Sequence, residues 1–347
     1  MTSPFSGSRH YAPVETMELR GVVLPARFGD PAAEYEAASR CVALFDRSDR
    51  GLLAVAGTDR KRWLHNLVTN AVTTLDDHSG AYAFALDVRG RIQFDLNVFC
   101  LPDVLWLDID AGTIPAARAH LERYLISEDV QLHDASAQFA RLGVCGPRAG
   151  EVAARLGVSD FSALSALSSR ELEGGAVRFV RHDFAGRPGF ELVVPRDDGG
   201  VWWQRLVQDG GAVPAGWRTL DVLRIEAGIP WLHRDLDDSV LPPETGQTGR
   251  AVSYQKGCYL GQEIVERMRS RGALARRLVR LWAPDGGDVR VPAPLFQNEQ
   301  EVGRLTSLVR HPLVQRWVGL GYLKTRVSEL TGISAGDPPR AIHIESP

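Results

Sequence analysis

The order of helix and strand signals between residues 51 and 145 constrains the fold of this chain more than any other feature. Apolar runs, alternating runs and helical periodicity predict the order strand–helix–strand–strand–strand–helix–strand. The segment RIQFDLNVF, residues 91–99, shows the alternation of apolar and polar residues typical of a half-buried strand. The complete order is that of a split β-α-β unit, so the sequence predicts a ferredoxin-like α+β lobe.

A second part of the chain repeats this rhythm, and a third part breaks it. Residues 149–226 carry helix, strand, strand and helix signals followed by a further apolar segment, so a second α+β lobe is expected. After an arginine-rich stretch ending at Arg277, short strand signals alternate with Pro, Gly and Asn turns. We therefore expect a loose lead-in over residues 1–20, a two-lobed body over 21–267, and an all-β barrel or sandwich over 273–345.

Composition places the chain among globular proteins and argues against several classes. Its 347 residues exceed one ordinary core, in agreement with more than one domain. The 40 basic and 43 acidic residues nearly balance, so no overall attraction to nucleic acid or to an anionic membrane is expected. No apolar run approaches the roughly 20 residues of a membrane helix, and the first residues lack a secretory pattern. We expect a cytoplasmic protein with no membrane and no direct nucleic-acid partner.

Four cysteines are scattered along the chain, at Cys41, Cys100, Cys145 and Cys258. They form no C-x-x-C, which argues against a zinc site or a complete iron–sulfur site built from neighbouring residues. Few, dispersed thiols fit a reducing compartment. Cys41 falls in a segment of helical apolar periodicity and Cys100 ends an apolar strand, so we expect both to be buried.

Cys258 lies in SYQKGCYLGQEIVERMRSRG, between glycines and ahead of a predicted helix. The positive end of that helix and the neighbouring Lys256 would favour the thiolate form. A nucleophile, a metal ligand, a redox contact and a small buried side chain all remain open. The flanking glycines favour turns or close backbone approach, but the residues alone do not decide between a functional thiol and core packing.

Two carboxylates stand out in the body. Glu226 lies in LRIEAG, which we assign to the end of a strand. A carboxylate there can accept two parallel N–H bonds from an amidine-like edge, such as that of a pterin or guanine. An exposed ion pair with Arg224 is the simpler explanation of the spacing alone. Asp95 lies on the strand face opposite Phe94, and from the residues alone an exposed strand face is the simpler explanation.

Several blocks of the sequence resemble one known group of proteins. The motif KGCYLGQE resembles the signature of the YgfZ family of folate-binding proteins, within the aminomethyltransferase (glycine-cleavage T-protein) superfamily. The blocks that resemble the wider superfamily, in the expected order, are FGDPAAEYEAASRCVALFDRS, GTDRKRWLHNLVTNAV, DVRGRIQFDL, LRIEAGIP, LPPETG and VGRLTS. The resemblance spans roughly residues 20 to 330, and KGCYLGQE is its specific part.

The resemblance implies a fold and a ligand. The fold would be a T-protein-like body of interwoven α+β lobes around a central hole, followed by a C-terminal β-barrel. The ligand would be tetrahydrofolate or a one-carbon derivative, with Glu226 at the pterin edge. Cys258 would be a functional thiol with no metal site of its own, able to share an iron–sulfur cluster with a partner. The further residues we expect around the folate are Arg224, Tyr82, Lys256, Tyr259, Gln262 and Arg267.

The sequence departs from the T-protein pattern at two places. Phe94-Asp95 stands where T-proteins tend to carry two aspartates, so Asp95 is the remaining candidate acid. His233 stands where they usually carry glycine, which would alter the floor or mouth of the pocket. Both departures argue against the aminomethyl transfer that the superfamily performs.

Two functions follow from the resemblance. The first is a tetrahydrofolate-binding accessory factor for assembly or repair of iron–sulfur clusters, serving four-iron enzymes that include tRNA-modifying ones. Its partners would be iron–sulfur carrier or client proteins. The second is a folate-dependent aminomethyl- or methyltransferase. KGCY and Phe94 favour the first, and Glu226 fits both.

Overall fold

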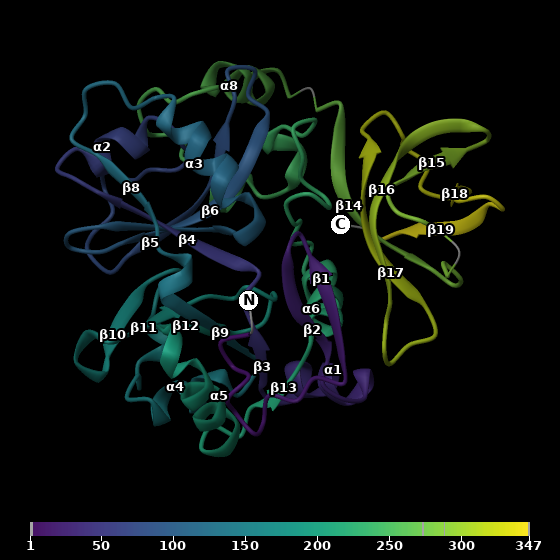
Figure 1. The fold of residues 1–347 in the computed structure, drawn as a ribbon. Helices are drawn as coiled ribbons and strands as arrows, with labels where there is room; N and C mark the ends of the chain where they lie inside the picture. Colours follow the sequence, from purple (N-terminus) through teal and green to yellow (C-terminus); the bar gives the residue numbers. More distant parts are fainter. Residues whose placement is uncertain (1–2, 273, 288, 346–347) are drawn as a thin grey trace.

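The computed structural model describes residues 3–272, 274–287 and 289–345. Figure 1 shows two α+β lobes side by side, a central hairpin and helix next to them, and a separate β-barrel at the C-terminal end. The α+β class with a C-terminal barrel, expected from the sequence, is confirmed. No helix among the described residues is long and apolar enough to cross a membrane.

The first lobe follows the order expected from residues 51–145. Its antiparallel sheet has the strand order β5-β6-β7-β4-β8. The bounds are β4 Arg50–Ala56, α2 Arg60–His65, β5 Gly80–Leu86, β6 Ile92–Cys100, β7 Leu105–Asp110, α3 Ile114–Glu122 and β8 Gln131–Asp134. β5 and β6 form a hairpin whose turn contains Arg89-Gly90, and Gly90 adopts the positive φ of 74° that the turn requires.

The second lobe contains a six-stranded sheet of order β10-β11-β12-β9-β3-β13. Its bounds are β3 Ala43–Asp46, β9 Phe139–Cys145, α4 Ala149–Arg155, β10 Ser169–Leu172, β11 Val177–Arg181, β12 Gly189–Pro195, α5 Gly199–Gln208 and β13 Val213–Pro214. β3 comes from the N-terminal part of the chain and pairs with β9, so the two lobes are interwoven in sequence.

A hairpin and two helices occupy the centre of the molecule. β1 Glu15–Leu19 and β2 Val22–Arg27 form a two-stranded sheet of their own, beside α1 Pro31–Arg40 and α6 Trp217–Glu226. The lead-in ahead of this hairpin was expected to be loose, but it packs on the second lobe. Phe5 is fully buried and contacts Trp203, and Tyr11 Oη donates to Asp46 Oδ2 at 2.6 Å, because these aromatic side chains cover the apolar face of α5.

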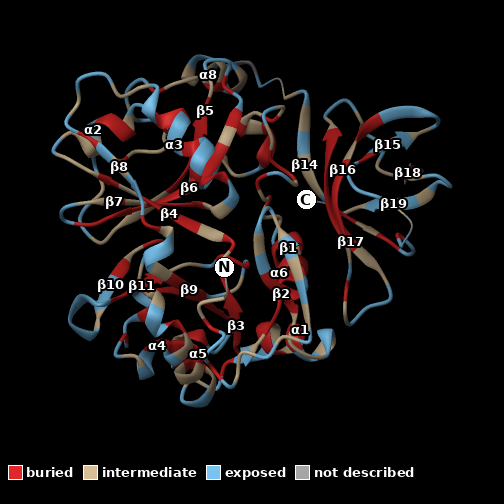
Figure 2. Ribbon diagram, viewed as in Figure 1, coloured by how far each residue is buried: buried red, intermediate tan, exposed pale blue. Residues whose placement is uncertain are grey.

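The C-terminal part is a closed barrel of six antiparallel strands, in the order β14-β17-β16-β15-β18-β19. The bounds of this part, with the two helices before it, are α7 Thr248–Ala251, α8 Gln262–Arg271, β14 Arg276–Ala283, β15 Ala293–Gln297, β16 Gln300–Arg310, β17 Trp317–Lys324, β18 Ile333–Ala335 and β19 Arg340–Ile344. The sequence left a barrel and a sandwich open, and the barrel is correct. In Figure 2 the buried residues follow the strands of the lobes and of β16 and β17.

Two sequence-based assignments of structure are wrong. Glu226 is the last residue of helix α6 rather than the end of a strand. This helix is buried on several sides, so the segment LDVLRIE does not show a one-sided helical period. Cys41 is exposed rather than buried, because it caps the C-terminus of α1 beyond that helix's packed face. Cys100 is buried, as expected. Cys145 is also buried, and Cys258 is exposed.

Candidate functional site

A cavity of about 200 Å³ lies where the two lobes, the hairpin and the loop after α6 meet. The residues that line it are Leu19, Arg20, Arg47, Asp49, Arg50, Asp95, Asp110, Trp217, Trp231, Leu232, His233 and Arg234. They come from parts of the sequence more than 200 residues apart, so only the folded chain brings them together. We call this space the central cavity.

A network of buried ion pairs forms the wall between the lobes. Arg141 donates to Asp108 Oδ1 at 2.8 Å and also pairs with Glu191, thereby joining the sheets of both lobes. Arg47 Nη1 donates to Glu191 Oε1 at 2.6 Å, and Arg50 Nε to Asp108 Oδ1 at 3.0 Å. Burial raises the pKa of the Asp108 carboxyl, but Arg141 and Arg50 outweigh burial and hold this pKa at about 2. The carboxylates of this network are therefore charged, and their ion-pair partners come from within the protein.

Asp95 is the exception among these acids. It is buried on β6, and Tyr82 Oη donates to its Oδ2 at 3.0 Å. Its Oδ1 has no hydrogen-bond partner among the described residues. Burial raises the pKa of Asp95, and neither Arg50 nor the Tyr82 hydrogen bond cancels this effect. A carboxyl group that is buried, half satisfied and at a cavity wall is the strongest candidate for a ligand contact.

Two tryptophans form an aromatic wall of the central cavity. The rings of Trp217, on α6, and Trp231, in the following loop, lie 4.3 Å apart at 40°. Trp217 Nε1 is buried with no partner in the described structure. Arg224 lies over the ring of Trp231, with its guanidinium carbon 4.6 Å from the ring centre. An aromatic wall of this kind suits a flat ring as a ligand.

Arg224 itself does not reach the central cavity, contrary to the sequence-based expectation. Its side chain is fully buried and pairs with Asp221 and Asp235, and its Nη2 donates to Ser307 Oγ at 2.7 Å. A guanidinium with no exposed surface cannot contact a ligand, so Arg224 fastens α6 to the following loop and to the barrel.

The rim of the cavity joins the hairpin tip to the first lobe. Arg20 donates to Asp110 Oδ1 at 2.6 Å and to Thr113 Oγ1 at 3.0 Å. His233 Nε2 lies 3.0 Å from the same Thr113 hydroxyl. His233 thus lies at the pocket, where the sequence indicated a change of floor or mouth. Burial, and then the charge of Arg20, lower its pKa.

Glu226 lies outside the central cavity. Its carboxylate accepts hydrogen bonds from Tyr35 Oη at 2.9 Å, lies 3.0 Å from His311 Nε2, and pairs with Arg187 Nη2 at 3.2 Å. It lines a separate cavity of about 270 Å³ between the body and the barrel. The ion pair with Arg224, which was the simpler explanation of the spacing, does not form, because Arg224 pairs with Asp221 and Asp235 instead.

The loop around Cys258 places its residues in different environments. Lys256 Nζ donates to the backbone carbonyls of His65, Val68 and Asn70, so its charge is directed into the protein rather than toward the thiol. Burial lowers the pKa of Lys256 to about 7. The structure therefore does not support the expectation that Lys256 favours the thiolate of Cys258.

The other expected residues of this loop divide in the same way. Tyr259 is buried beneath Lys256, and Gln262 Oε1 accepts from the Tyr259 backbone N–H at 3.3 Å. Arg267 is exposed on α8. None of them lines the central cavity, and neither does Cys258. Of the residues expected around the folate, Tyr82 contacts the cavity residue Asp95, and Arg224 packs on the cavity residue Trp231 from behind.

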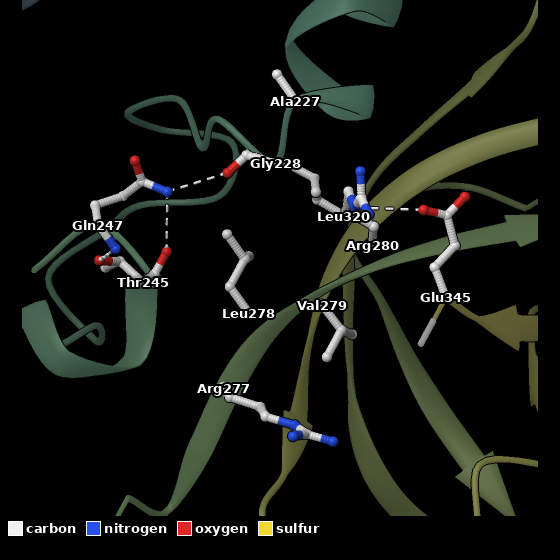
Figure 3. Close-up of a pocket in the computed structure, with 11 residues that line it drawn as sticks. Ala227, Gly228, Thr245, Gln247, Arg277, Leu278, Val279, Arg280, Leu320 and Glu345 are labelled. Carbon is white, nitrogen blue, oxygen red and sulfur yellow. Dashed lines mark hydrogen bonds and ion pairs between the residues drawn. The ribbon is translucent and has the colours of Figure 1, made fainter. Parts of the chain in front are cut away.

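A second cavity, of about 280 Å³, lies at the seam between the body and β14 of the barrel. Figure 3 shows Arg280 beside Glu345 on one side, and Gln247 beside Gly228 and Thr245 on the other. Arg280 pairs with Glu345 at 3.3 Å and donates to the Glu226 carbonyl at 2.7 Å. Gln247 Nε2 donates to the Gly228 carbonyl at 3.1 Å. These polar groups bind one another, so they stabilise the contact between the body and the barrel. The central cavity is therefore the better candidate for a ligand site.

Sequence reasoning missed most of the central cavity. Arg20, Arg47, Trp217 and Trp231 gave no signal, because each lies in a different segment and no local motif unites them. Within the described residues no group of three or more His, Cys, Asp or Glu side chains could hold a metal ion. Among these residues, Cys258 belongs to no such group.

Comparisons with known proteins agree on one family. Residues 11–256 match the family model described as the GCVT N-terminal domain. The chain is 30% identical over 323 residues to an aminomethyltransferase of Halalkalibacterium halodurans, covering 91% of this chain and 88% of that protein. It is 29% identical over 324 residues to an aminomethyltransferase of Bacillus subtilis, covering 91% and 89%.

The fold agrees with a solved structure as well. The crystal structure of glycine cleavage system aminomethyltransferase T from Bartonella henselae superposes with a TM-score of 0.86 at 22% identity. The match covers 96% of this chain and 94% of that one, so it includes both lobes and the barrel.

Proposed function

This chain belongs to the family of the GCVT N-terminal domain, the glycine-cleavage T-protein family, and on that premise we propose that it binds a reduced folate in the central cavity. The observation that carries the proposal is Asp95, a buried carboxyl with an unpartnered oxygen at the wall of that cavity. The pterin ring of a folate is flat and carries N–H donors and ring acceptors. Such a ring complements the Trp217–Trp231 wall and the Asp95 carboxyl.

We further propose the YgfZ branch of this family, with a role in maturation of iron–sulfur proteins. Support comes from KGCYLGQE and from the exposure of its cysteine, Cys258. A cluster usually needs four protein ligands, so a single thiol would share a cluster with a partner's cysteines or act as a transient contact. Cys258 does not line the central cavity, so folate binding and thiol function are separate activities in this proposal.

Aminomethyl transfer is the alternative, and the names of the relatives favour it. In this chain Phe94 is buried in the core of the first lobe, so only Asp95 remains as an acid at that position. His233 adds an imidazole to the rim. A transferase needs its carrier in near-attack geometry and an acid or base in place, and both features act against this.

Titration calorimetry with tetrahydrofolate tests the folate proposal and the residue assignment together. Asp95→Asn should weaken binding by about one to two orders of magnitude, since a hydrogen bond to a charged partner is worth about 1.5–3 kcal/mol. Glu226→Gln is the matched control, and it should bind as the wild type does. The opposite result, a loss in Glu226→Gln alone, would restore Glu226 as the pterin contact.

The thiol proposal needs a different measurement. In cells lacking the native protein, Cys258→Ala should fail to restore the activity of four-iron enzymes, whereas Cys41→Ala should restore it, because both thiols are exposed but only Cys258 lies in the signature. Restoration by both variants would remove the thiol from the function. Formation of methylenetetrahydrofolate from an aminomethyl-loaded lipoyl carrier, at a rate within about tenfold of a true T-protein, would favour the transferase instead.

A further inference from the structure

The tip of the β1–β2 hairpin has an unusual backbone for its sequence. Leu19 pairs with Val22, so the loop has only two residues, Arg20 and Gly21, and their φ angles are 52° and 82°. Two positive φ angles define the type I′ turn, for which Asn-Gly is the favoured sequence. Arginine has no such advantage, since a left-handed conformation is costly for any residue with a long side chain. The geometry of the turn therefore does not explain why an arginine occupies position 20.

A second residue at the same place is unusual in the same way. His233, in the loop after α6, also adopts a left-handed φ, of 63°. Its Nε2 and the Arg20 Nη2 both lie 3.0 Å from Thr113 Oγ1. Two strained residues from separate segments thus meet at one hydroxyl on the rim of the central cavity. Strain that the surrounding structure maintains is a reason to look for a functional contact.

The first lobe is shaped to receive the hairpin tip. A Cβ atom at Gly112 would lie 3.0 Å from the Arg20 Cβ, so glycine allows the close approach. The hairpin joins neither lobe's sheet, and Figure 1 shows it standing beside α6 between the lobes and the barrel. The contact of Arg20 with Asp110 and Thr113 therefore bridges the cavity rim without support from a strand ladder.

The volume of the central cavity limits which ligands fit behind this bridge. Sites for drug-sized ligands usually enclose about 300–1,000 Å³, whereas the central cavity encloses about 200 Å³. That space suits a bicyclic ring but not a ring with a long substituent. A tailed ligand must leave the cavity through the rim.

We propose that Arg20, fastened to Asp110 and Thr113, is a latch that selects ligands of the central cavity by size. A ring alone fits behind the closed latch, whereas a ring with a tail binds only after the Arg20 contact has opened. The inference rests on the proposed folate site and names the residue that controls entry to it. Arg20 and Asp110 are partly exposed, with side-chain exposures of 28% and 17%, so the ion pair is weak enough to open reversibly.

A reversible crosslink tests the latch directly. Arg20→Cys with Gly112→Cys places two Cβ atoms near the roughly 3.5–4.5 Å that a disulfide spans, and peptide mapping confirms the bond. The two probes are tetrahydrofolate and 6-methyltetrahydropterin, a reduced ring without the tail. The oxidised protein should bind the ring as the reduced protein does and should lose at least tenfold in affinity for tetrahydrofolate. Reduction with dithiothreitol should restore that affinity.

A second variant opens the latch without a crosslink. Arg20→Asn keeps a residue that favours the turn and removes the guanidinium. Releasing an exposed ion pair worth about 0.2–1 kcal/mol should raise tetrahydrofolate affinity by about 1.5- to fivefold and leave ring affinity unchanged. Arg27→Asn is the matched control, because it removes the Arg27–Glu15 pair from the other end of the same hairpin and should change neither affinity.

The outcomes separate the latch from the folate site. Equal tetrahydrofolate affinity in the oxidised and reduced proteins would overturn the latch while leaving the folate site intact. Failure of the two cysteines to crosslink would show that the tip does not rest on Gly112, and would also overturn it. If the wild type bound neither probe, the folate proposal itself would be wrong, and the latch would fall with it.

Discussion

Asp108 and Asp95 lie on adjacent strands of the first lobe, and both are buried, yet their surroundings are opposite. Asp108 on β7 accepts from Arg141, Arg50 and Asn97, and its pKa is held at about 2. Asp95 on β6 accepts a hydrogen bond from Tyr82 alone among the described residues, and burial raises its pKa. Burial alone therefore does not identify a functional carboxylate. The number of partners supplied by the protein separates the structural acid from the acid available to a ligand.

Removing the cation that joins the lobes, Arg141, should have the largest effect on the free energy of unfolding. Arg141→Leu leaves Asp108 and Glu191 short of a partner, and breaking a buried pair in this way costs about 3–5 kcal/mol. Urea unfolding followed by circular dichroism measures this loss. Arg118→Leu is the control, because its pair with Glu122 is exposed and should contribute less than about 1 kcal/mol. Equal losses in both variants would mean that the network does not hold the lobes together.

The network also sets how stability depends on pH. The pKa of Asp108 is lowered from 3.8 to about 2 in the folded protein, so its contribution is present above pH 4 and is lost as the pH falls toward 2. Stability measured across this range should fall less steeply in Arg141→Leu than in the wild type.

Asp95→Asn should have a smaller effect of opposite sign. The pKa of Asp95 is raised by burial, so the folded protein loses stability as the pH rises from 3.8 through the folded-state pKa. Asparagine removes that penalty and can still accept from Tyr82. We expect the variant to be more stable than the wild type by about 1–3 kcal/mol at pH 8, with the difference disappearing below pH 4. A variant less stable than the wild type at pH 8 would mean that the Asp95 carboxylate is structural.

The sequence predicted the architecture because periodicity is a local signal. The alternation in residues 91–99 and the order of elements over 51–145 specify the first lobe directly. The sequence predicted a strand end at Glu226 because apolar residues are dense in the segment that forms α6. Burial of this helix on several sides hides its helical period. The domain boundaries at 21–267 and 273–345 stay a proposal. In the structure, α8 ends at Arg271 and β14 begins at Arg276.

The candidate site was less predictable because its chemistry depends on partners that are remote in sequence. RIEAG and KGCYLGQE are local motifs, and they directed attention to Glu226 and Cys258, which lie outside the central cavity. Asp95 was identified by position. Its distinguishing property is that it forms no ion pair among the described residues. Only the tertiary structure reveals this, because Arg50 and Arg141 pair with Asp108 instead.

Tyr82→Phe should give the smallest effect and sharpens the comparison of the two acids. The Tyr82 hydroxyl is the one donor to Asp95 among the described residues, and this hydrogen bond lowers the carboxyl pKa against the effect of burial. Without it, the pKa of Asp95 should rise further, which carboxyl carbon NMR can follow during an acid titration. Stability should fall by about 1 kcal/mol at pH values above the raised pKa of Asp95, where the carboxylate is charged. Tyr322→Phe is the control, since the buried Tyr322 hydroxyl has no partner in the described structure, and its removal should not destabilise the protein.

In the Asp95→Asn background the loss of stability caused by Tyr82→Phe should shrink, because a hydrogen bond to a neutral amide is weaker than one to a carboxylate. An equal loss in both backgrounds would mean that the Tyr82 hydroxyl acts through packing, and that the Asp95 carboxylate is not the group it stabilises.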